Sequence, residues 1–177
     1  MLDLAKSKYN PIMEEKMESR MTMIVSAGVL SVALSLPANA GEKISGHNTD
    51  FQTLSEVTAT IPDKPGHILK QTVVTFKTTS GSFSGWSTQI AQNETVGGDV
   101  TAKGYITHHH DNGDITYDAF EGTSKITPKG PGAFETIAQG KFHMMGGTGT
   151  HNIKASGTYN CAFTQSSGAC DWQGETE

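Results

Sequence analysis

Three consecutive histidines, His108, His109 and His110, are the first residues of this chain whose types and spacing suggest chemistry. Side chains alternate between the two faces of a strand, so His108 and His110 would project from one face. Two imidazoles at this spacing can bind one transition metal, but a competent site needs further ligands. Candidates for those ligands lie elsewhere in the chain: Glu121, Tyr117 and His67. Because a tight turn follows directly, we interpret the triplet as a solvated strand end without a metal.

Other catalytic patterns are missing from the sequence. Ser84 lacks the G-x-S-x-G frame of a hydrolase nucleophile, and Asp111 and Asp114 belong to a turn. The run Gly-Gly-Thr-Gly at 146–149 resembles a phosphate loop, but no Lys-Ser/Thr pair or helix follows it, so we interpret it as a turn with positive φ. The sequence therefore assigns no catalytic residue, no metal and no cofactor.

Two cysteines, Cys161 and Cys170, are the only ones in the chain. The polar residues between them are typical of a turn that joins two strands, and in an oxidising compartment a lone nearby pair predicts a disulfide. A thiol-exchange centre would show C-x-x-C spacing, which this pair does not have. We therefore expect a structural disulfide across a hairpin.

Short segments rich in Thr, Val, Ile, Tyr and Phe recur between clusters of Gly, Pro, Asn and Asp, a pattern typical of a sandwich or barrel. We expect strands at residues 51–61, 67–79, 83–90, 100–110, 114–125, 134–145, 156–163 and 169–175. Eight strands can close on themselves and so remove exposed edges. The sequence therefore predicts an all-β domain, an eight-stranded antiparallel β-barrel with a central cavity. Only residues 150–155 could form a helical turn.

The Asn112-Gly113 pair sets the register that we expect between two of these strands. Asn-Gly favours a two-residue type I′ turn, which would pair His108 with Tyr117. Period-two alternation then places Glu121 on the same inward face, and puts Lys103 and Asp118 on the wet face. In the next strand Phe142 alternates with charged neighbours and would also face inward. Trp86 and Trp172 are expected in the core or on the cavity wall.

The candidate ligand-binding residues follow from that register: His108, Tyr117, Glu121 and Phe142. For Glu121 two interpretations stay open. An inward carboxylate would need a partner or a shifted pKa, as is common at functional sites. At a barrel mouth it would instead meet water or a lysine, which we favour.

Several short runs together resemble the exported bacterial relatives of the allene oxide cyclase barrel, in the superfamily that includes dirigent proteins. They are D-N-G-D at 111–114, F-E-G at 120–122, G-G-T-G at 146–149, S-G-T-Y at 156–159 and D-W-Q-G-E at 171–175. The resemblance implies an eight-stranded barrel whose cavity holds a reactive intermediate. The chain departs from the family pattern at Thr150, His151 and Asn152, and none of its residues matches a cyclase catalytic position.

Charge and length exclude several classes of partner. Residues 41–177 contain nine lysines, no arginine and fourteen acidic residues, so they offer no basic face for nucleic acid or an anionic membrane. The apolar run 21–36 follows Lys16 and Arg20, and it ends in an A-x-A site before Gly41. It is shorter than the roughly 20 apolar residues of a membrane span. We therefore expect residues 1–40 to be a signal peptide cleaved between Ala40 and Gly41, without stable membrane insertion afterwards.

The sequence thus predicts a periplasmic or secreted domain at residues 41–177, with two functional hypotheses. The first is a non-catalytic barrel that binds a small, mostly apolar molecule in its cavity. The alternative is a cyclase-like isomerase, or a dirigent-like protein, that steers a reactive intermediate in the same cavity. A barrel filled by side chains would favour a purely structural role.

Overall fold

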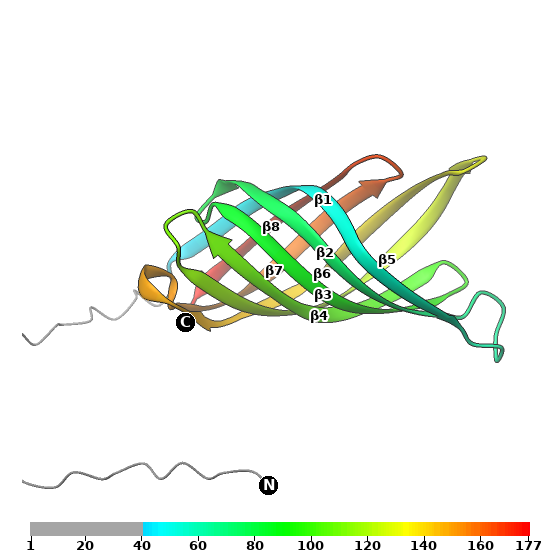
Figure 1. Ribbon diagram of the computed structural model, residues 1–177, viewed down its shortest axis with the longest axis horizontal. Helices are drawn as coiled ribbons and strands as arrows, with labels where there is room; N and C mark the ends of the chain where they lie inside the picture. The colour runs from blue at the N-terminus through cyan, green and yellow to red at the C-terminus, as the bar shows by residue number, and fades with distance from the viewer. Residues whose placement is uncertain (1–40) are drawn as a thin grey trace, which may run out of the picture. The chain divides into compact units, whose positions relative to one another are not determined.

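The structure, a computed structural model, describes residues 41–177 and shows one closed antiparallel barrel in which neighbouring strands follow chain order (Figure 1). The eight strands are β1 (Lys43–Thr60), β2 (Ile68–Gly81), β3 (Gly85–Val96), β4 (Asp99–His110), β5 (Ile115–Gly130), β6 (Ala133–Gly147), β7 (Lys154–Thr164) and β8 (Gly168–Thr176). The predicted all-β class and eight-stranded antiparallel barrel are confirmed. The predicted signal peptide, up to Ala40, lies outside the described residues.

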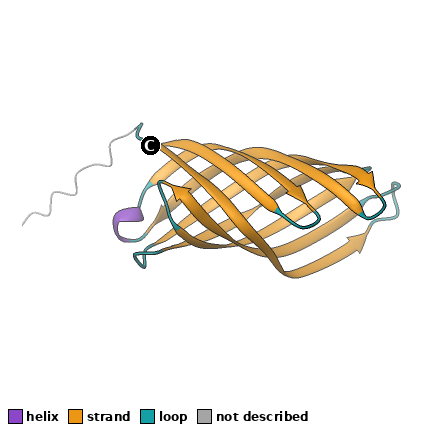
Figure 2. Ribbon diagram, turned by 90° about the horizontal axis from the view of Figure 1, so that it is seen from above, coloured by secondary structure: helices purple, strands orange, loops and turns teal. Residues whose placement is uncertain are grey.

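The two ends of the barrel differ. At one end the β6–β7 connection forms a short 3₁₀ helix, η1 (Gly149–His151), drawn in purple in Figure 2. At the other end the tips of the β1–β2 and β5–β6 hairpins spread apart (Figure 1). The observed helical turn, η1, thus begins one residue before the predicted range of 150–155 and ends earlier. It lies at the end of the barrel opposite the spread hairpins (Figure 1).

Inward and outward positions alternate along the strands, as expected for a barrel wall. On β6, Phe142 and Met144 are buried, whereas Lys141 and His143 are exposed. The buried apolar cluster draws on seven inward positions: Ile44, Ala91, Phe120, Phe142, Met144, Ala155 and Trp172. The predicted inward face of β6 is thus confirmed.

The β4–β5 hairpin differs from the expected type I′ turn by one residue. Gly113 N–H donates to the His110 carbonyl at 2.9 Å, and His110 N–H donates to the Asp114 carbonyl at 2.9 Å. Gly113 has φ +89°, whereas Asn112 is not among the described residues with positive φ. This is the pattern of a three-residue loop closed by a left-handed glycine, so the type I′ prediction is wrong.

The extra loop residue moves the register by one position. His108 pairs with Thr116 and Thr107 with Tyr117, in place of the expected pair of His108 with Tyr117. A slip of one residue exchanges the two faces of a strand. On β5 the buried positions are consequently Thr116, Asp118 and Phe120, while Tyr117 and Glu121 are exposed. The predicted inward face of β4 is unaffected.

The cysteines and tryptophans confirm one set of expectations and correct another. Cys161 pairs with Cys170 across the β7–β8 hairpin, at disulfide-bonding distance, as predicted. Trp172 is buried inside the barrel, also as predicted. Trp86 is 52% exposed on the outer wall and stacks on His109, with ring centroids 4.0 Å apart, so its predicted place in the core is wrong.

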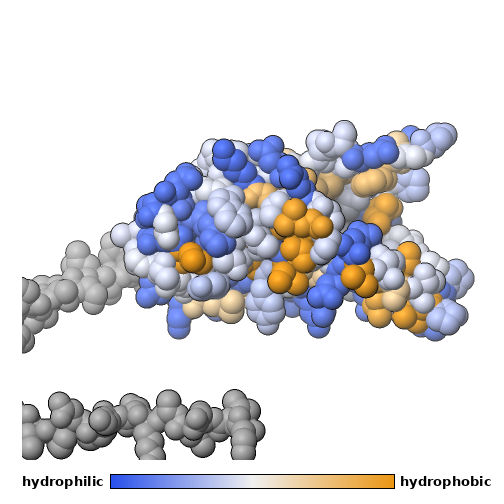
Figure 3. All heavy atoms as spheres, in the orientation of Figure 1, coloured by the Kyte–Doolittle hydropathy of each residue, from blue (hydrophilic) through white to orange (hydrophobic). Residues whose placement is uncertain are grey.

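On the face of the barrel that Figure 3 shows, hydrophilic areas alternate with patches of apolar side chains. The exposed large hydrophobic residues on the outer wall include Val57, Leu69, Ile90, Tyr105 and Ile137. None of these five residues lines the enclosed space inside the barrel. Among the helices that the structure describes, none is long and apolar enough to cross a membrane.

Candidate functional site

A cavity of about 310 Å³ lies inside the barrel, and side chains from all eight strands line it. Its volume falls at the lower end of the range of roughly 300–1,000 Å³ that is usual for small-molecule sites. Aromatic rings form much of its wall: Phe51, Phe76, Phe120, Phe142, Phe163 and Trp172. The barrel is therefore not completely filled by its own side chains.

Contacts between rings hold this wall in place. Phe51 stacks on Phe76 with centroids 5.0 Å apart and meets the edge of Phe163 at 5.1 Å. Phe142 meets Trp172 edge to face at 5.7 Å. Such ring pairs each contribute about 0.5–1.5 kcal/mol beyond their burial, so they stabilise the apolar surface of the cavity.

The polar groups of the cavity centre on a hydrogen-bonded chain of three side chains, Ser87, His108 and Asp118. His108 Nε2 lies 2.8 Å from Asp118 Oδ2, and His108 Nδ1 lies 2.6 Å from Ser87 Oγ. When Nε2 donates to the Asp118 oxygen, Nδ1 of a neutral ring accepts from the serine hydroxyl. The side chain of His108 is 12% exposed and that of Asp118 is 4% exposed, so the pair is shielded from bulk water.

The second carboxylate oxygen of Asp118 is the exception in this network. Oδ1 is buried and has no hydrogen-bond partner among the described residues. An unpaired buried acceptor costs about 1–3 kcal/mol, and such groups often mark a binding or catalytic role. Asp118 is one of the residues that line the cavity, and its unused acceptor is itself almost without accessible surface.

Ser87, the serine of this hydrogen-bonded network, is not placed as a hydrolytic nucleophile. Ser87 is 1% exposed, and it is not one of the residues that line the cavity. A molecule held in the cavity would contact His108 and Asp118, while Ser87 fixes the orientation of the imidazole from behind. The geometry therefore suits binding and proton placement rather than acyl transfer.

A second polar cluster closes the end of the barrel near η1. Asp114 Oδ2 accepts from the Thr150 N–H at 3.0 Å and lies 2.9 Å from His151 Nδ1. These bonds, led by the one with His151, hold the pKa of Asp114 well below its usual range. His110 is buried beside this cluster and bonds Thr116 Oγ1 through Nε2 at 2.6 Å. The cluster thus ties the β4–β5 turn to the β6–β7 connection.

Burial, followed by electrostatic repulsion from the neighbouring His151 and His108, lowers the pKa of His110 to about 4. The imidazole is therefore neutral at pH 7. Buried His110 also shows that the interpretation of the histidine triplet as a solvated strand end is wrong. Within residues 41–177, no group of three or more His, Cys, Asp or Glu side chains is placed to hold a metal ion.

Tyr159 lines the cavity on the β7 side. Its hydroxyl lies over Gly122 and Gly140, where a Cβ atom on either glycine would collide with it. Burial, followed by the negative charge of Glu121, raises the pKa of Tyr159 to about 12. The hydroxyl is therefore protonated at neutral pH and available as a hydrogen-bond donor.

Two of the four predicted ligand-binding residues, His108 and Phe142, line the cavity. The inward placement expected for Tyr117 and Glu121 is wrong, because the register places both on the outer wall. Sequence reasoning missed Ser87 and Asp118, which belong to no motif. The only available signal for Asp118 was the hairpin register, which places it on the same face as His108.

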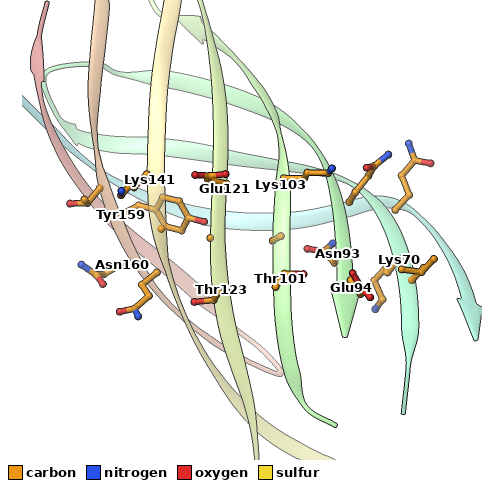
Figure 4. Close-up of a pocket in the computed structure, with 18 of the residues that line it drawn as sticks. Lys70, Asn93, Glu94, Thr101, Lys103, Glu121, Thr123, Lys141, Tyr159 and Asn160 are labelled. Atoms are coloured by element: carbon orange, nitrogen blue, oxygen red, sulfur yellow. The ribbon is translucent and has the colours of Figure 1, made fainter. Parts of the chain in front are cut away.

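Glu121 instead belongs to a broad depression on the outer wall, with a volume of about 1190 Å³ (Figure 4). It lies between Lys103 on β4 and Lys141 on β6, its partners in register. The favoured interpretation of Glu121 expected contact with water or a lysine at a barrel mouth. Glu121 is exposed to water and has lysines on both neighbouring strands, but it lies on the outer wall and not at a mouth. We take the cavity inside the barrel as the candidate site, because aromatic side chains line it together with the hydrogen-bonded His108–Asp118 pair. No protein-family model and no curated protein matches this chain.

Proposed function

We propose that this protein binds a small, mostly apolar molecule in the cavity of its barrel. The observation that carries the proposal is the combination of aromatic walls with a few polar groups in a space of about 310 Å³. Such sites gain affinity from burial of apolar surface and orientation from the polar groups. A ligand would enter between the spread hairpins, at the end opposite η1.

The test is to fill the cavity. Ala138 lines it, whereas Ala119 on β5 faces outward between Tyr105 and His143. We expect Ala138→Trp to abolish binding of the neutral fluorescent probe N-phenyl-1-naphthylamine, and Ala119→Trp to leave binding within about two-fold of wild type. Both variants are first compared with wild type by circular dichroism. Wild-type protein that does not bind the probe would contradict the proposal.

Native mass spectrometry of protein purified from its source provides an independent test. A noncovalent ligand that is released unchanged on denaturation supports a binding role. The expected mass is that of a compound with few rings, because the cavity is near the lower size limit for ligand sites.

A second candidate function is the control of a reactive intermediate, by an isomerase of the cyclase type or a dirigent-like protein. The observation that favours it is the His108–Asp118 pair on the cavity wall, which could place a proton on a bound molecule. If the retained compound is converted to a product during incubation with the protein, this candidate replaces the first. His108→Ala should then stop conversion while the compound still binds.

We further propose that the chain is an exported relative of the allene oxide cyclase barrel, acting in the periplasm or outside the cell. The eight-stranded barrel and the cysteine pair at disulfide-bonding distance support this proposal. N-terminal sequencing of protein recovered outside the cytoplasm should begin at Gly41. An uncleaved cytoplasmic product would contradict export.

A further inference from the structure

We infer that the cavity selects ligands whose polar group is a neutral hydrogen-bond donor, a hydroxyl or N–H group on an aromatic or alicyclic frame, and that Asp118 Oδ1 accepts this bond. The inference rests on the proposed binding function and names the ligand class. It starts from the one buried side-chain polar atom that lacks a partner in the described part of the chain.

The rest of the network leaves Asp118 Oδ1 free for a ligand. Oδ2 is held by His108, whose other ring nitrogen is held by Ser87, so neither histidine nitrogen can turn to satisfy Oδ1. Asp118 is 3% exposed, which keeps bulk water away from the unpaired oxygen. A donor brought in by a ligand would therefore remove the cost of an unsatisfied buried acceptor.

The charge of the cavity lining excludes ligands that carry a carboxylate. No lysine is present among the described residues that line the cavity, and residues 41–177 contain no arginine. The imidazole of His108 is already bonded to Asp118. A ligand carboxylate would thus lose its hydration and meet another carboxylate with no lysine or arginine in the lining to compensate, which is strongly unfavourable.

Apolar neighbours of Asp118 favour an apolar ring system as the part of the ligand that carries the donor. Phe120 follows on the same face of β5, and Met144 is the partner of Asp118 on β6. Ile106, the partner of Asp118 on β4, also lines the cavity. A flat ring system can pack on these side chains while its hydroxyl reaches the carboxylate.

The experiment compares three two-ring probes of similar size by displacement of N-phenyl-1-naphthylamine from the full-length protein. They are 2-naphthol, which carries a donor, 2-fluoronaphthalene, which does not, and 2-naphthoate, which carries a carboxylate. We expect 2-naphthol to bind about ten-fold or more tightly than 2-fluoronaphthalene. We expect 2-naphthoate to bind more weakly than either.

Two variants locate the effect. In Asp118→Asn the amide oxygen is a weaker acceptor, and when it keeps the bond from His108 an N–H group replaces Oδ1. The preference for 2-naphthol over 2-fluoronaphthalene should fall to about two-fold or less. The matched control, Glu121→Gln on the outward face of the same strand, should keep the full preference.

The outcomes separate the inference from the function on which it rests. Equal affinity of the wild type for 2-naphthol and 2-fluoronaphthalene overturns the inference and leaves the binding function standing. A preference that survives in Asp118→Asn shows that another group accepts the bond, and it also overturns the inference. If neither neutral probe nor the fluorescent reporter binds, the proposed function fails, and the inference falls with it.

Discussion

His110 and His151 stack face to face, with ring centroids 3.8 Å apart and ring planes within 8° of parallel. One ring comes from the end of β4 and the other from η1, so the stack joins segments that are distant in the sequence. Phe83 packs against both rings, at 5.3 Å from each. A positive charge on His151 would repel one on His110, so the stack favours the neutral form of His110.

The first prediction is a loss of stability in mild acid. The unfolded chain takes up a proton on His110 near pH 6.5, whereas the folded protein does not until about pH 4. The contribution of neutral, buried His110 to the free energy of unfolding is therefore fully present above pH 6.5, and it is lost as the pH falls from 6.5 towards 4. Urea unfolding at several pH values should show a decline of about 1.4 kcal/mol per pH unit from this proton.

Two glutamine variants identify the titrating group. His110→Gln should remove this decline, because the amide does not titrate. His109→Gln, on the outer wall beside Trp86, should retain it. Identical pH profiles for wild type and His110→Gln would show that other groups cause the acid sensitivity.

The second prediction concerns Gly113 in the β4–β5 loop. A Cβ at this position would meet no atom within 4 Å, so substitution is limited by the backbone and not by space. Since φ is +89°, Gly113→Val should lower the free energy of unfolding by about 1–3 kcal/mol. Gly113→Asn should cost clearly less, because asparagine tolerates left-handed backbone. Denaturant unfolding compares the two, and equal losses would argue against a conformational cause.

The third prediction concerns the cysteine pair at the β7–β8 hairpin. Cross-linking a loop this short restricts the unfolded chain by an amount on the order of 2–3 kcal/mol. Oxidised wild type should therefore be more stable than the Cys161→Ser, Cys170→Ser double variant by that amount, as measured by urea unfolding. In the presence of a reductant the difference should shrink to about 1 kcal/mol or less. Two free thiols in unreduced, unfolded protein would contradict the bridge.

The fourth prediction uses the two tryptophans as a matched pair. Trp172 is buried among Phe83, Phe142 and Asn48, whereas Trp86 lies on the outer wall. Trp172→Ala should cost about 3–5 kcal/mol, as is usual for a large buried ring, and Trp86→Ala about 1 kcal/mol. Thermal or urea unfolding measures both losses. A larger loss for Trp86 would show that the outer wall is covered in solution.

The sequence by itself determined the strand content and several of the faces. Period-two alternation identified the inward side chains of β6, such as Phe142, and those of β4, such as His108, because each strand carries this pattern independently of its partners. Punctuation by Gly, Pro, Asn and Asp separated eight strands, and the spacing of Cys161 and Cys170 predicted their hairpin.

Only the tertiary structure decided how β5 aligns with β4. Asn-Gly is compatible with a two-residue turn and with a three-residue loop that ends in a left-handed glycine. The longer loop is held by Asp114, whose carboxylate bonds Thr150 and His151 of the β6–β7 connection. These contacts span more than thirty residues of chain, so local propensity could not reveal them.

The site follows from that same alignment. Moving the register by one residue turns Glu121 and Tyr117 outward and brings Asp118 to His108 inside the barrel. Asp118 looked like a surface residue in the sequence because a carboxylate is costly to bury. Its burial depends on the hydrogen bond from His108 on the paired strand β4, and on the remaining strands of the closed barrel, which shield both side chains from water.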